Sequence, residues 1–465
     1  MGLTACAMVI ALGTHASADI ERAQERVLAA KPAAVLVTAR VDADVVVDCG
    51  TGRQTVKAAP FVENGTGWLV DGRGLVITNA HVIDPAHARP PWVLQELRRS
   101  AIEKACVDPV LARQGLMRGD RIDIEEQLRR RADPARVTVN AVPSIVVTVA
   151  NGKTLRADVK KFSPPLRLDA RGTPLPGSGR DLALLAIAPG VYPALSLAAE
   201  TPRIGETVHI IGFPGVVLRH ELLSRTAVVE ATVTKGFVSS FKTDAIGQDV
   251  IQTDAGAAHG SSGAPAIGPA GSVLGVLTFV SLSRDSGDVV QGFNFLIPAK
   301  DVGRFLDGMD VTPGDSKFGV VWRAGLRDLF SGHYGSAAAR LAEADTLVPG
   351  LPDVKRVLEE ARNPPPQPFP WLSVAIGVTV VSAAAFGAIA WRSWWRNRFR
   401  IRASEVARML EDGKDLLIID VRDVTRGQIG GLRIPGALRV TPAALARGEM
   451  TVDGPRDRTV VAYCS

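Results

Sequence analysis

Three short stretches of this 465-residue chain carry side chains that could act together on a substrate. His81 lies in "TNAHV" directly after an apolar run, Asp181 precedes "LALL", and Ser262 lies in the small-residue turn "GSSGAP". A serine hydroxyl becomes a strong nucleophile when an imidazole takes its proton and a buried carboxylate orients that imidazole. The three residues therefore predict a charge-relay nucleophile in the order His, Asp, Ser.

The turn that carries the serine also predicts an oxyanion-binding site. Gly260 allows an unusual backbone conformation, so that the amides of Gly260 and Ser262 can point together at a developing negative charge. The preceding residues, "GAAH" at 256–259, contain no acid that could hold Lys or Arg. We therefore expect a small or medium apolar side chain just before the scissile bond.

The elements that position these residues are mostly strands. Short β-rich runs separated by glycine and proline extend from about residue 30 to 310, which is typical of an all-β barrel or sandwich. One stretch at about 85–135 is rich in Leu, Arg and Glu and predicts two or three inserted helices. Its acids and bases nearly balance, so we expect a solvated helix face and no nucleic-acid partner despite the net charge of +6.

Residues 60–300 resemble the trypsin-like serine proteases of the HtrA type, and we assign a protease domain to 30–310. The family landmarks follow in order: "GTGWLV", "GLVITNAHVI", "RDLALLAI", "IIGFPG", "TDAGAAHGSSGAP" and "GFNFLIPA". The resemblance implies an all-β chymotrypsin-like double barrel that cleaves polypeptide substrates with no cofactor and no metal. It also implies that Leu277, Thr278 and Phe279 pair with the substrate backbone as an added strand.

The sequence departs from the family pattern at a few positions. Ser261 stands where the family usually has Asn or Asp, and Ala264 stands where it usually has Gly. Both residues are small and leave the triad intact, so we expect an active serine endopeptidase. The alternative is an inactive protease fold that acts as a peptide-binding or sensor module. Whether the chain forms a homo-oligomer is open.

Two apolar segments indicate a membrane location. Residues 1–18 combine a short apolar run with a small-residue cleavage site, as in a signal peptide, or form an N-terminal anchor. Residues 371–391 carry no charge, are long enough to span a bilayer and have Trp at each edge. The arginine-rich segment at 392–402 predicts a cytoplasmic C-terminus. We therefore expect a single-pass protein of the bacterial inner membrane, with its protease domain periplasmic or extracellular.

The regions flanking the transmembrane segment give further predictions. Residues 318–362 have helical periodicity and resemble one tetratricopeptide (TPR-like) hairpin, with a helical spacer as the alternative. Residues 363–370 form a proline-rich linker. Residues 400–465 resemble part of an α/β rhodanese domain, which we expect to be incomplete in this sequence. Cys464 falls where that family carries its sulfur-accepting thiolate.

The other cysteines fit this topology. Cys49 and Cys106 would lie in an oxidising compartment, whereas Cys464 would be cytoplasmic and reduced. A disulfide between Cys49 and Cys106 is compatible with this arrangement, but their spacing leaves the pairing open.

Overall fold

The computed structural model describes residues 20–50, 52–132, 137–169, 171–218, 220–224, 230–282, 289–366, 371–422, 433–449, 451 and 457–464. The chain divides into two compact units, Met1–Pro365 and Pro366–Ser465. The predicted signal peptide or anchor at 1–18 lies outside the described residues.

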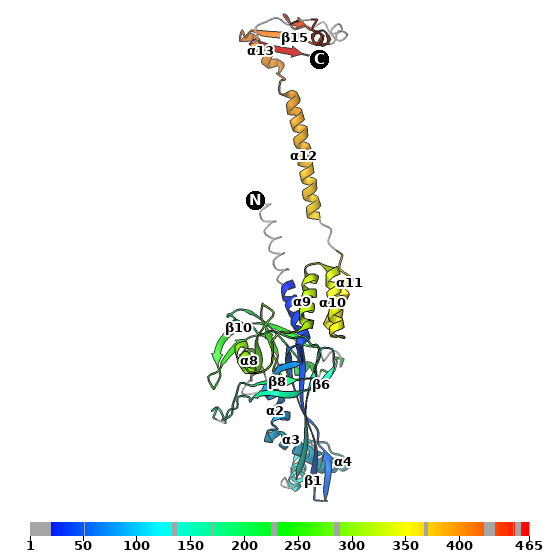
Figure 1. Cartoon of the computed structure of the whole chain (residues 1–465), viewed down its shortest axis with the longest axis vertical. Helices are drawn as coiled ribbons and strands as arrows, with labels where there is room; N and C mark the ends of the chain where they lie inside the picture. The colour runs from blue at the N-terminus through cyan, green and yellow to red at the C-terminus, as the bar shows by residue number, and fades with distance from the viewer. Residues whose placement is uncertain are drawn as a thin grey trace. The chain divides into compact units, whose positions relative to one another are not determined.

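Two β-sheets form the centre of the first unit (Figure 1). The first sheet, within the described residues, contains β1 (Ala34–Asp48), β2 (Arg53–Lys57), β3 (Phe61–Asp71), β4 (Leu75–Thr78), β5 (Thr138–Thr148), β6 (Thr154–Arg156), β7 (Asp158–Ser163) and β8 (Leu182–Ala186). The second contains β9 (Thr207–Gly212), β10 (Thr232–Thr243), β11 (Asp249–Thr253), β12 (Pro265–Ile267), β13 (Val273–Leu282) and β14 (Val289–Pro298).

The two sheets differ in closure. The second is a closed barrel in the order β10-β11-β14-β13-β12-β9. Pairing in the first sheet runs β6-β5-β1-β3-β4-β8-β7, with β2 beside β1, and the described residues include no pair that closes it. Of the expected double barrel, one half is therefore closed, and the other half is an open sheet in the described residues with β6 and β7 at its edges.

The core of the first sheet follows from the sequence of β1. Its first four residues, "AVLV", are all buried, so both faces of the strand are covered at this end. From Ala39 onwards buried residues alternate with more exposed ones, as in a strand with one solvated face. Trp68, Ile77 and Leu184 complete this core from β3, β4 and β8.

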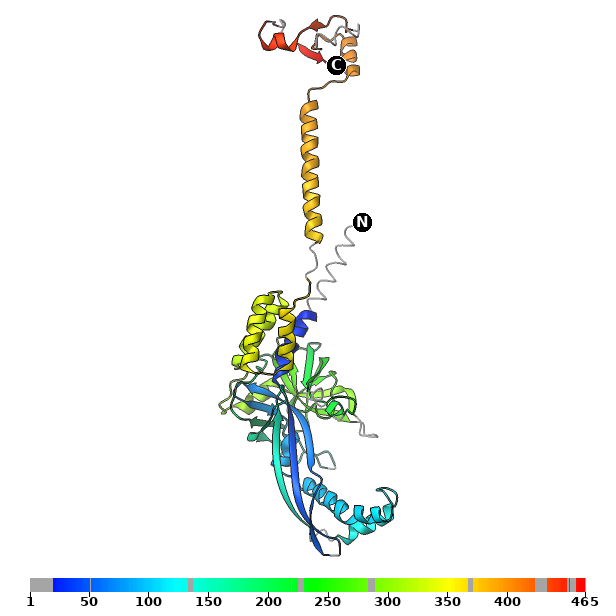
Figure 2. The ribbon, with the colours of Figure 1, turned by 90° about the vertical axis from the view of Figure 1, so that its right-hand side faces the viewer.

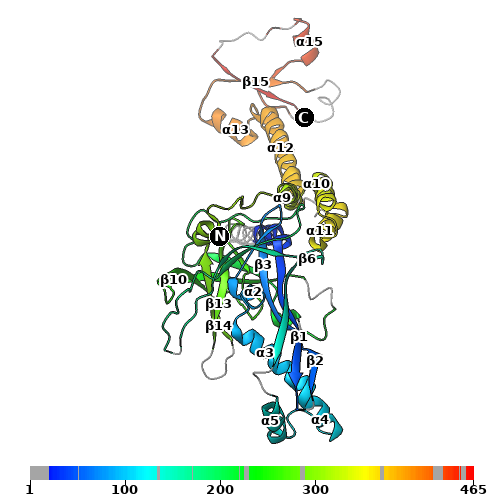
Figure 3. The same ribbon diagram turned by 60° about the horizontal axis from the view of Figure 1, so that its bottom comes forward.

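The strands β1, β2 and β5 extend well beyond the sheet and form an arm that carries inserted helices (Figure 2). The insertion contains α3 (Pro91–Ile102), the π-helical turn η2 (Glu103–Val107), α4 (Asp108–Arg113) and α5 (Ile122–Arg131), which confirms the predicted helices. Figure 3 shows α4 and α5 near β1 and β2 at the end of the arm. A disulfide joins Cys49, after β1, to Cys106 in η2, so the pairing left open by the sequence is formed.

Charged side chains of the arm pair mainly with one another. The Arg118 guanidinium binds Asp108 and Glu103, and Arg129 binds Glu125 four residues earlier in α5. These pairs place acids beside bases on the described helices of the arm, so their charges neutralise each other locally.

Three helices follow the second barrel and its short helix α8 (Ala299–Leu306): α9 (Lys317–Phe330), α10 (Tyr334–Leu347) and α11 (Pro352–Arg362). The predicted helices at 318–362 are therefore confirmed. They pack on the helix at 20–30, where the Trp322 Nε1–H donates to the Leu28 carbonyl over 3.0 Å. The TPR-like resemblance stays a prediction.

The second unit begins with α12 (Trp371–Asn397). It is the one helix of the described residues that is long and apolar enough to cross a membrane. A small parallel sheet follows, in the order β16 (Leu438–Arg439), β15 (Leu416–Asp420) and β17 (Thr459–Tyr463), with α13 (Ala403–Glu411) and α15 (Pro442–Ala446). The exposed Cys464 has a free thiol. The rhodanese-like assignment and its sulfur-accepting role for Cys464 stay predictions.

Candidate active site

His81 and Asp181 meet at the ends of two paired strands. The helix α2 (Ala80–His87) follows β4 and carries His81, while Asp181 directly precedes β8. Because β4 and β8 are antiparallel neighbours, they bring residues 100 positions apart together. The Asp181 Oδ2 lies 2.8 Å from the His81 Nδ1, and Asp181 Oδ1 accepts the His81 backbone N–H over 2.9 Å. One carboxylate thus orients both the ring and the backbone of the histidine.

The backbone of Asp181 has a left-handed conformation, with φ of +57°. Residues other than glycine rarely adopt this conformation, and the instances that do occur cluster at functional sites. Two hydrogen bonds hold it: the Asn79 side chain donates to the Asp181 carbonyl over 2.9 Å, and the Asp181 N–H donates to the Pro164 carbonyl over 3.1 Å. The unusual backbone turns the carboxylate of Asp181 towards His81.

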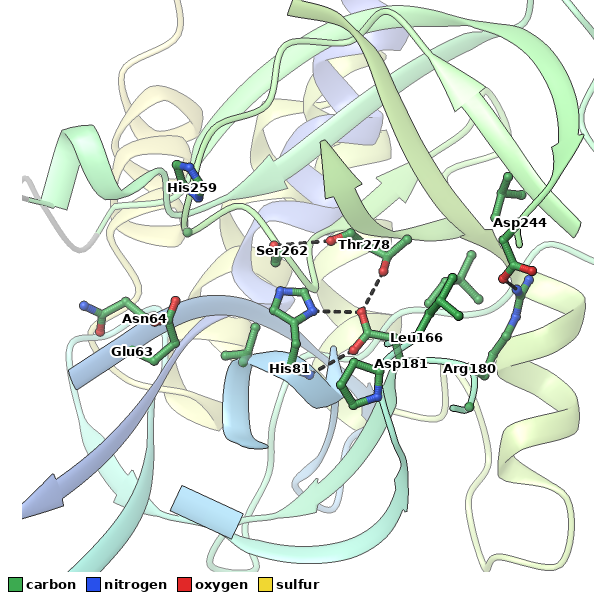
Figure 4. Close-up of a pocket in the computed structure, with 16 residues that line it drawn as sticks. Glu63, Asn64, His81, Leu166, Arg180, Asp181, Asp244, His259, Ser262 and Thr278 are labelled. Atoms are coloured by element: carbon green, nitrogen blue, oxygen red, sulfur yellow. Dashed lines mark hydrogen bonds and ion pairs between the residues drawn. The ribbon is translucent and has the colours of Figure 1, made fainter. Parts of the chain in front are cut away.

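Thr278 completes the shell around this carboxylate from the second barrel. Its Oγ1 donates to Asp181 Oδ2 over 2.7 Å, so this oxygen is shared between the threonine and the imidazole (Figure 4). This role of Thr278 was not predicted from the sequence. The expectation for its neighbour Leu277 is corrected: its side chain is buried, and its N–H and C=O bind Ala264 and Gly263, so its backbone is not available to a substrate strand. The side chain of Phe279 lies outside the described part.

Ser262 lies beside His81 in the same cleft (Figure 4). Its Oγ donates to the Thr278 carbonyl over 3.4 Å, which is a long hydrogen bond. To reach the imidazole the hydroxyl must rotate away from this carbonyl. Catalytic hydrogen bonds are often long or poorly aligned before substrate binds, so this orientation is compatible with a nucleophile.

Thr66 of β3 holds the serine turn against the first sheet. Its N–H donates to the Ser262 carbonyl over 2.8 Å, and its Oγ1 donates to the Gly260 carbonyl over 2.8 Å. Gly263 packs so closely here that a Cβ would lie 2.0 Å from the Thr66 carbonyl oxygen. The turn therefore requires glycine at this position, and Thr66 is a positioning residue that no sequence motif indicated.

The turn that carries the two predicted oxyanion amides has an unusual backbone at Gly260. Gly260 has φ of +92°, and a Cβ at this residue would lie 2.7 Å from both the Gly215 nitrogen and the Phe213 oxygen. The Gly215 N–H holds the His259 carbonyl, so the Gly260 N–H on the opposite side of that trans peptide points away from Gly215. Among the described residues neither the Gly260 nor the Ser262 N–H has a protein acceptor.

The electrostatics of the cleft favour an imidazolium. Burial opposes protonation of His81, but the negative charge and hydrogen bond of Asp181 outweigh it, with help from Glu63 and Asp84, and raise the pKa of His81 above its ordinary value. The cleft has a volume of about 380 Å³ and continues past Asp181 to Leu166, Asp244 and Ile297. Within the described residues no group of three or more His, Cys, Asp or Glu could hold a metal ion.

Comparisons with known proteins agree with this architecture. Residues 65–276 match the family described as trypsin-like peptidase domain. The chain is 30% identical over 135 residues to the serine endoprotease DegS of Salmonella typhimurium, covering 27% of this chain and 34% of the relative. It is 28% identical over 170 residues to the serine protease Do-like HtrA of Lactobacillus helveticus, covering 35% and 36%.

A solved structure, the serine endoprotease from Yersinia pestis, aligns with 60% of this chain and 64% of its own at 21% identity and a TM-score of 0.33. The chain spans about a third of the length of the DegS and HtrA relatives that it matches. Residues 65–276 are thus similar to a trypsin-like peptidase domain and to parts of DegS and HtrA proteases, and this similarity supports the predicted protease domain.

Proposed function

We propose that this chain is a membrane-anchored serine endopeptidase in which Ser262 is the nucleophile, His81 the general base and Asp181 the orienting carboxylate. The observation that carries the proposal is the 2.8 Å contact between His81 Nδ1 and Asp181 Oδ2 in the cleft that also contains Ser262. The similarity to DegS and HtrA proteases supports the same reaction.

The chemistry follows from the charges at the site. Ser262 Oγ attacks the carbonyl carbon of a peptide bond while its proton passes to His81 Nε2. The carbonyl oxygen becomes an oxyanion, to which the Gly260 and Ser262 N–H groups donate. Asp181 stabilises the imidazolium that has formed, because its charged carboxylate accepts a hydrogen bond from the Nδ1–H.

Breakdown of this intermediate returns the proton. His81 donates it to the amine that leaves, and the C–N bond breaks to give an ester between the substrate acyl group and Ser262. Water then attacks the ester with His81 again as base, and the serine is released. The small residues before the turn favour substrates with small or medium apolar side chains before the scissile bond.

A fluorophosphonate probe tests the proposed reaction, since it forms a covalent bond only with an activated serine. We expect the wild-type chain to be labelled and to cleave an unfolded protein, and Ser262→Ala to lose both properties while keeping its melting temperature. Ser261→Ala, one residue away, is the matched control and should still be labelled. Absence of labelling in the folded wild type would contradict the proposal and favour a peptide-binding module.

The location is part of the same proposal. We place the protease domain outside the cytoplasm, with α12 as the single membrane span and the C-terminus inside. The disulfide between Cys49 and Cys106 supports an oxidising compartment for the first unit, and the arginines after Trp391 support a cytoplasmic end. A reporter active only in the cytoplasm should work when fused after Arg402 and fail at Pro364. The reverse pattern would overturn this topology.

A further inference from the structure

Arg180, directly before Asp181, is a buried cation that the proposed reaction does not use. Its side chain is 12% exposed, although it lines the edge of the cleft. Its guanidinium binds three acceptors by hydrogen bonds: the Gln248 side chain over 2.9 Å, the Asp249 carbonyl and the Asp301 carboxylate. Asp244 lies 3.6 Å away. The side chain of Arg180, which lies just before β8 of the first sheet, thus binds acceptors in the second half of the domain.

These acceptors belong to the β10–β11 hairpin, in which Asp249 begins β11, and to α8. Gln248 and Asp244 lie in the turn between β10 and β11, and Asp301 lies in the first turn of α8. The turn is built independently of Arg180, because Asp244 Oδ1 accepts the N–H groups of Ile246 and Gln248. Arg180 therefore links two elements that are already folded, and its contacts determine where the backbone at 180–181 lies against the second barrel.

The link matters because the triad is divided between the two halves. His81 and Asp181 come from the first sheet, whereas Ser262 comes from the second barrel. Thr66 joins the halves on the serine side, and Arg180 joins them on the aspartate side. The Arg180 backbone N–H also donates to Ser163 Oγ over 2.7 Å. The backbone is therefore fixed directly before Asp181, the residue with positive φ.

We infer that Arg180 is a positioning residue for the Asp181–His81 pair, which it holds in register with Ser262 by binding the β10–β11 turn and α8. The inference rests on the proposed protease function. An error of about 1 Å in such a register can cost about 100-fold in rate. Lysine cannot replace it fully, since the guanidinium divides these contacts between Nη1 and Nη2, whereas an ammonium offers a single nitrogen.

Kinetics of the full-length chain test this role. Arg180→Gln should lower kcat per folded molecule about 10- to 100-fold and change KM less than about threefold, with Arg180→Lys in between. The matched control is Arg73→Gln, which breaks an arginine link from the β3–β4 turn to Asp71 and Asp310, away from the cleft. An Arg180→Gln loss no larger than that of Arg73→Gln would overturn the inference.

A double-mutant cycle separates positioning from general destabilisation. If Arg180 acts through Asp181, Arg180→Gln in an Asp181→Asn background should lower kcat less than about threefold further. An equal loss in both backgrounds would contradict the role. If Arg180→Gln does not fold, Arg180→Lys carries both comparisons.

A spectroscopic readout remains if the proposed protease activity is absent. In Ser262→Ala, the low-field proton resonance of the His81 Nδ1–H reports its hydrogen bond to Asp181 without any turnover. Arg180→Gln or Arg180→Lys should shift or broaden this resonance, whereas Arg73→Gln should leave it in place. An unchanged resonance in the Arg180 variants would overturn the positioning role independently of the fluorophosphonate result.

Discussion

The two halves of the candidate site are held in different ways. On the first sheet, Asp181 uses both carboxylate oxygens and both backbone groups in hydrogen bonds of 2.7–3.1 Å. On the second barrel, Ser262 has its carbonyl held by Thr66, but its hydroxyl makes one contact of 3.4 Å. The carboxylate is rigidly oriented, and the nucleophilic oxygen is weakly held.

This difference follows from what each group must do. The carboxylate keeps its charge and position throughout the proposed reaction, so orienting it in advance avoids reorganisation at the transition state. The hydroxyl must first turn to His81 and then form a bond to carbon, so a strong hydrogen bond to Thr278 would have to be broken. Stronger contacts at the aspartate and weaker contacts at the serine therefore serve the same reaction.

Removing the charge of the Asp181 carboxylate should lower kcat more than any other change. Asp181→Asn can donate its amide to His81, which favours the wrong tautomer and leaves the imidazolium uncompensated. We expect kcat to fall about 10⁴-fold, the size that this change has in other serine protease triads. Active-site-normalised kcat and a melting curve should be measured together.

The control for this change is Asp71→Asn, since Asp71 is also a buried carboxylate but binds Arg73 and the Thr312 N–H away from the cleft. It should lower the melting temperature and leave kcat per folded molecule nearly normal. If Asp181→Asn behaves like this control, Asp181 is a structural residue and the comparison of the two halves fails.

Removing one hydrogen bond from the Asp181 carboxylate, while keeping its charge, should lower kcat by an intermediate amount. Thr278→Val keeps the shape of the side chain and removes one hydrogen bond to Asp181 Oδ2, so we expect kcat to fall about 10-fold. Thr148→Val, which breaks a hydroxyl contact with Thr154 in the first sheet, is the control. Equal kcat values in the two variants would show that the second barrel does not orient Asp181.

The smallest effect concerns the pH profile. Only neutral His81 can accept the serine proton, so kcat/KM should rise with pH through the pKa of His81, which lies above its ordinary value of 6.5. Glu63 contributes to this raised pKa, so Glu63→Gln should move the rise to lower pH by about half a pH unit or less. Glu126→Gln, at an exposed position of α5, should leave the pH profile unchanged. A shift to higher pH in Glu63→Gln would contradict the assigned electrostatics.

The sequence contained enough to propose the triad, because His81 follows and Asp181 precedes an apolar run, Ser262 lies in a small-residue turn, and the three occur in a known order. It did not indicate Thr66, Thr278 or Arg180 as positioning residues. The hydrogen-bond partners that these side chains reach across the two halves are 68 to 194 positions away in the chain, so no local pattern records the contact. The positive φ of Asp181 was equally hidden, since it arises from bonds to Asn79 and Pro164.

In the arm, too, the sequence did not indicate contacts between residues that are distant in the chain. The composition of residues 85–135, rich in Leu, Arg and Glu, predicted the inserted helices. That β1 continues to Asp48 depends on pairing with β2 and β5, which only the folded chain supplies. The Cys49–Cys106 disulfide likewise depends on where η2 packs.

The members of the proposed triad are divided between the two halves of the domain. This division also determines when a newly synthesised molecule could cleave a substrate. Ribosomes release the N-terminal half first, and domains fold as their segments become available. The first sheet is complete once β8 has been made, but the second barrel closes only when β14, ending at Pro298, pairs with β11 and β13. If the proposed roles hold, a growing chain would have its base and carboxylate long before its nucleophile is in position, and it could not digest itself or its neighbours while it is being synthesised.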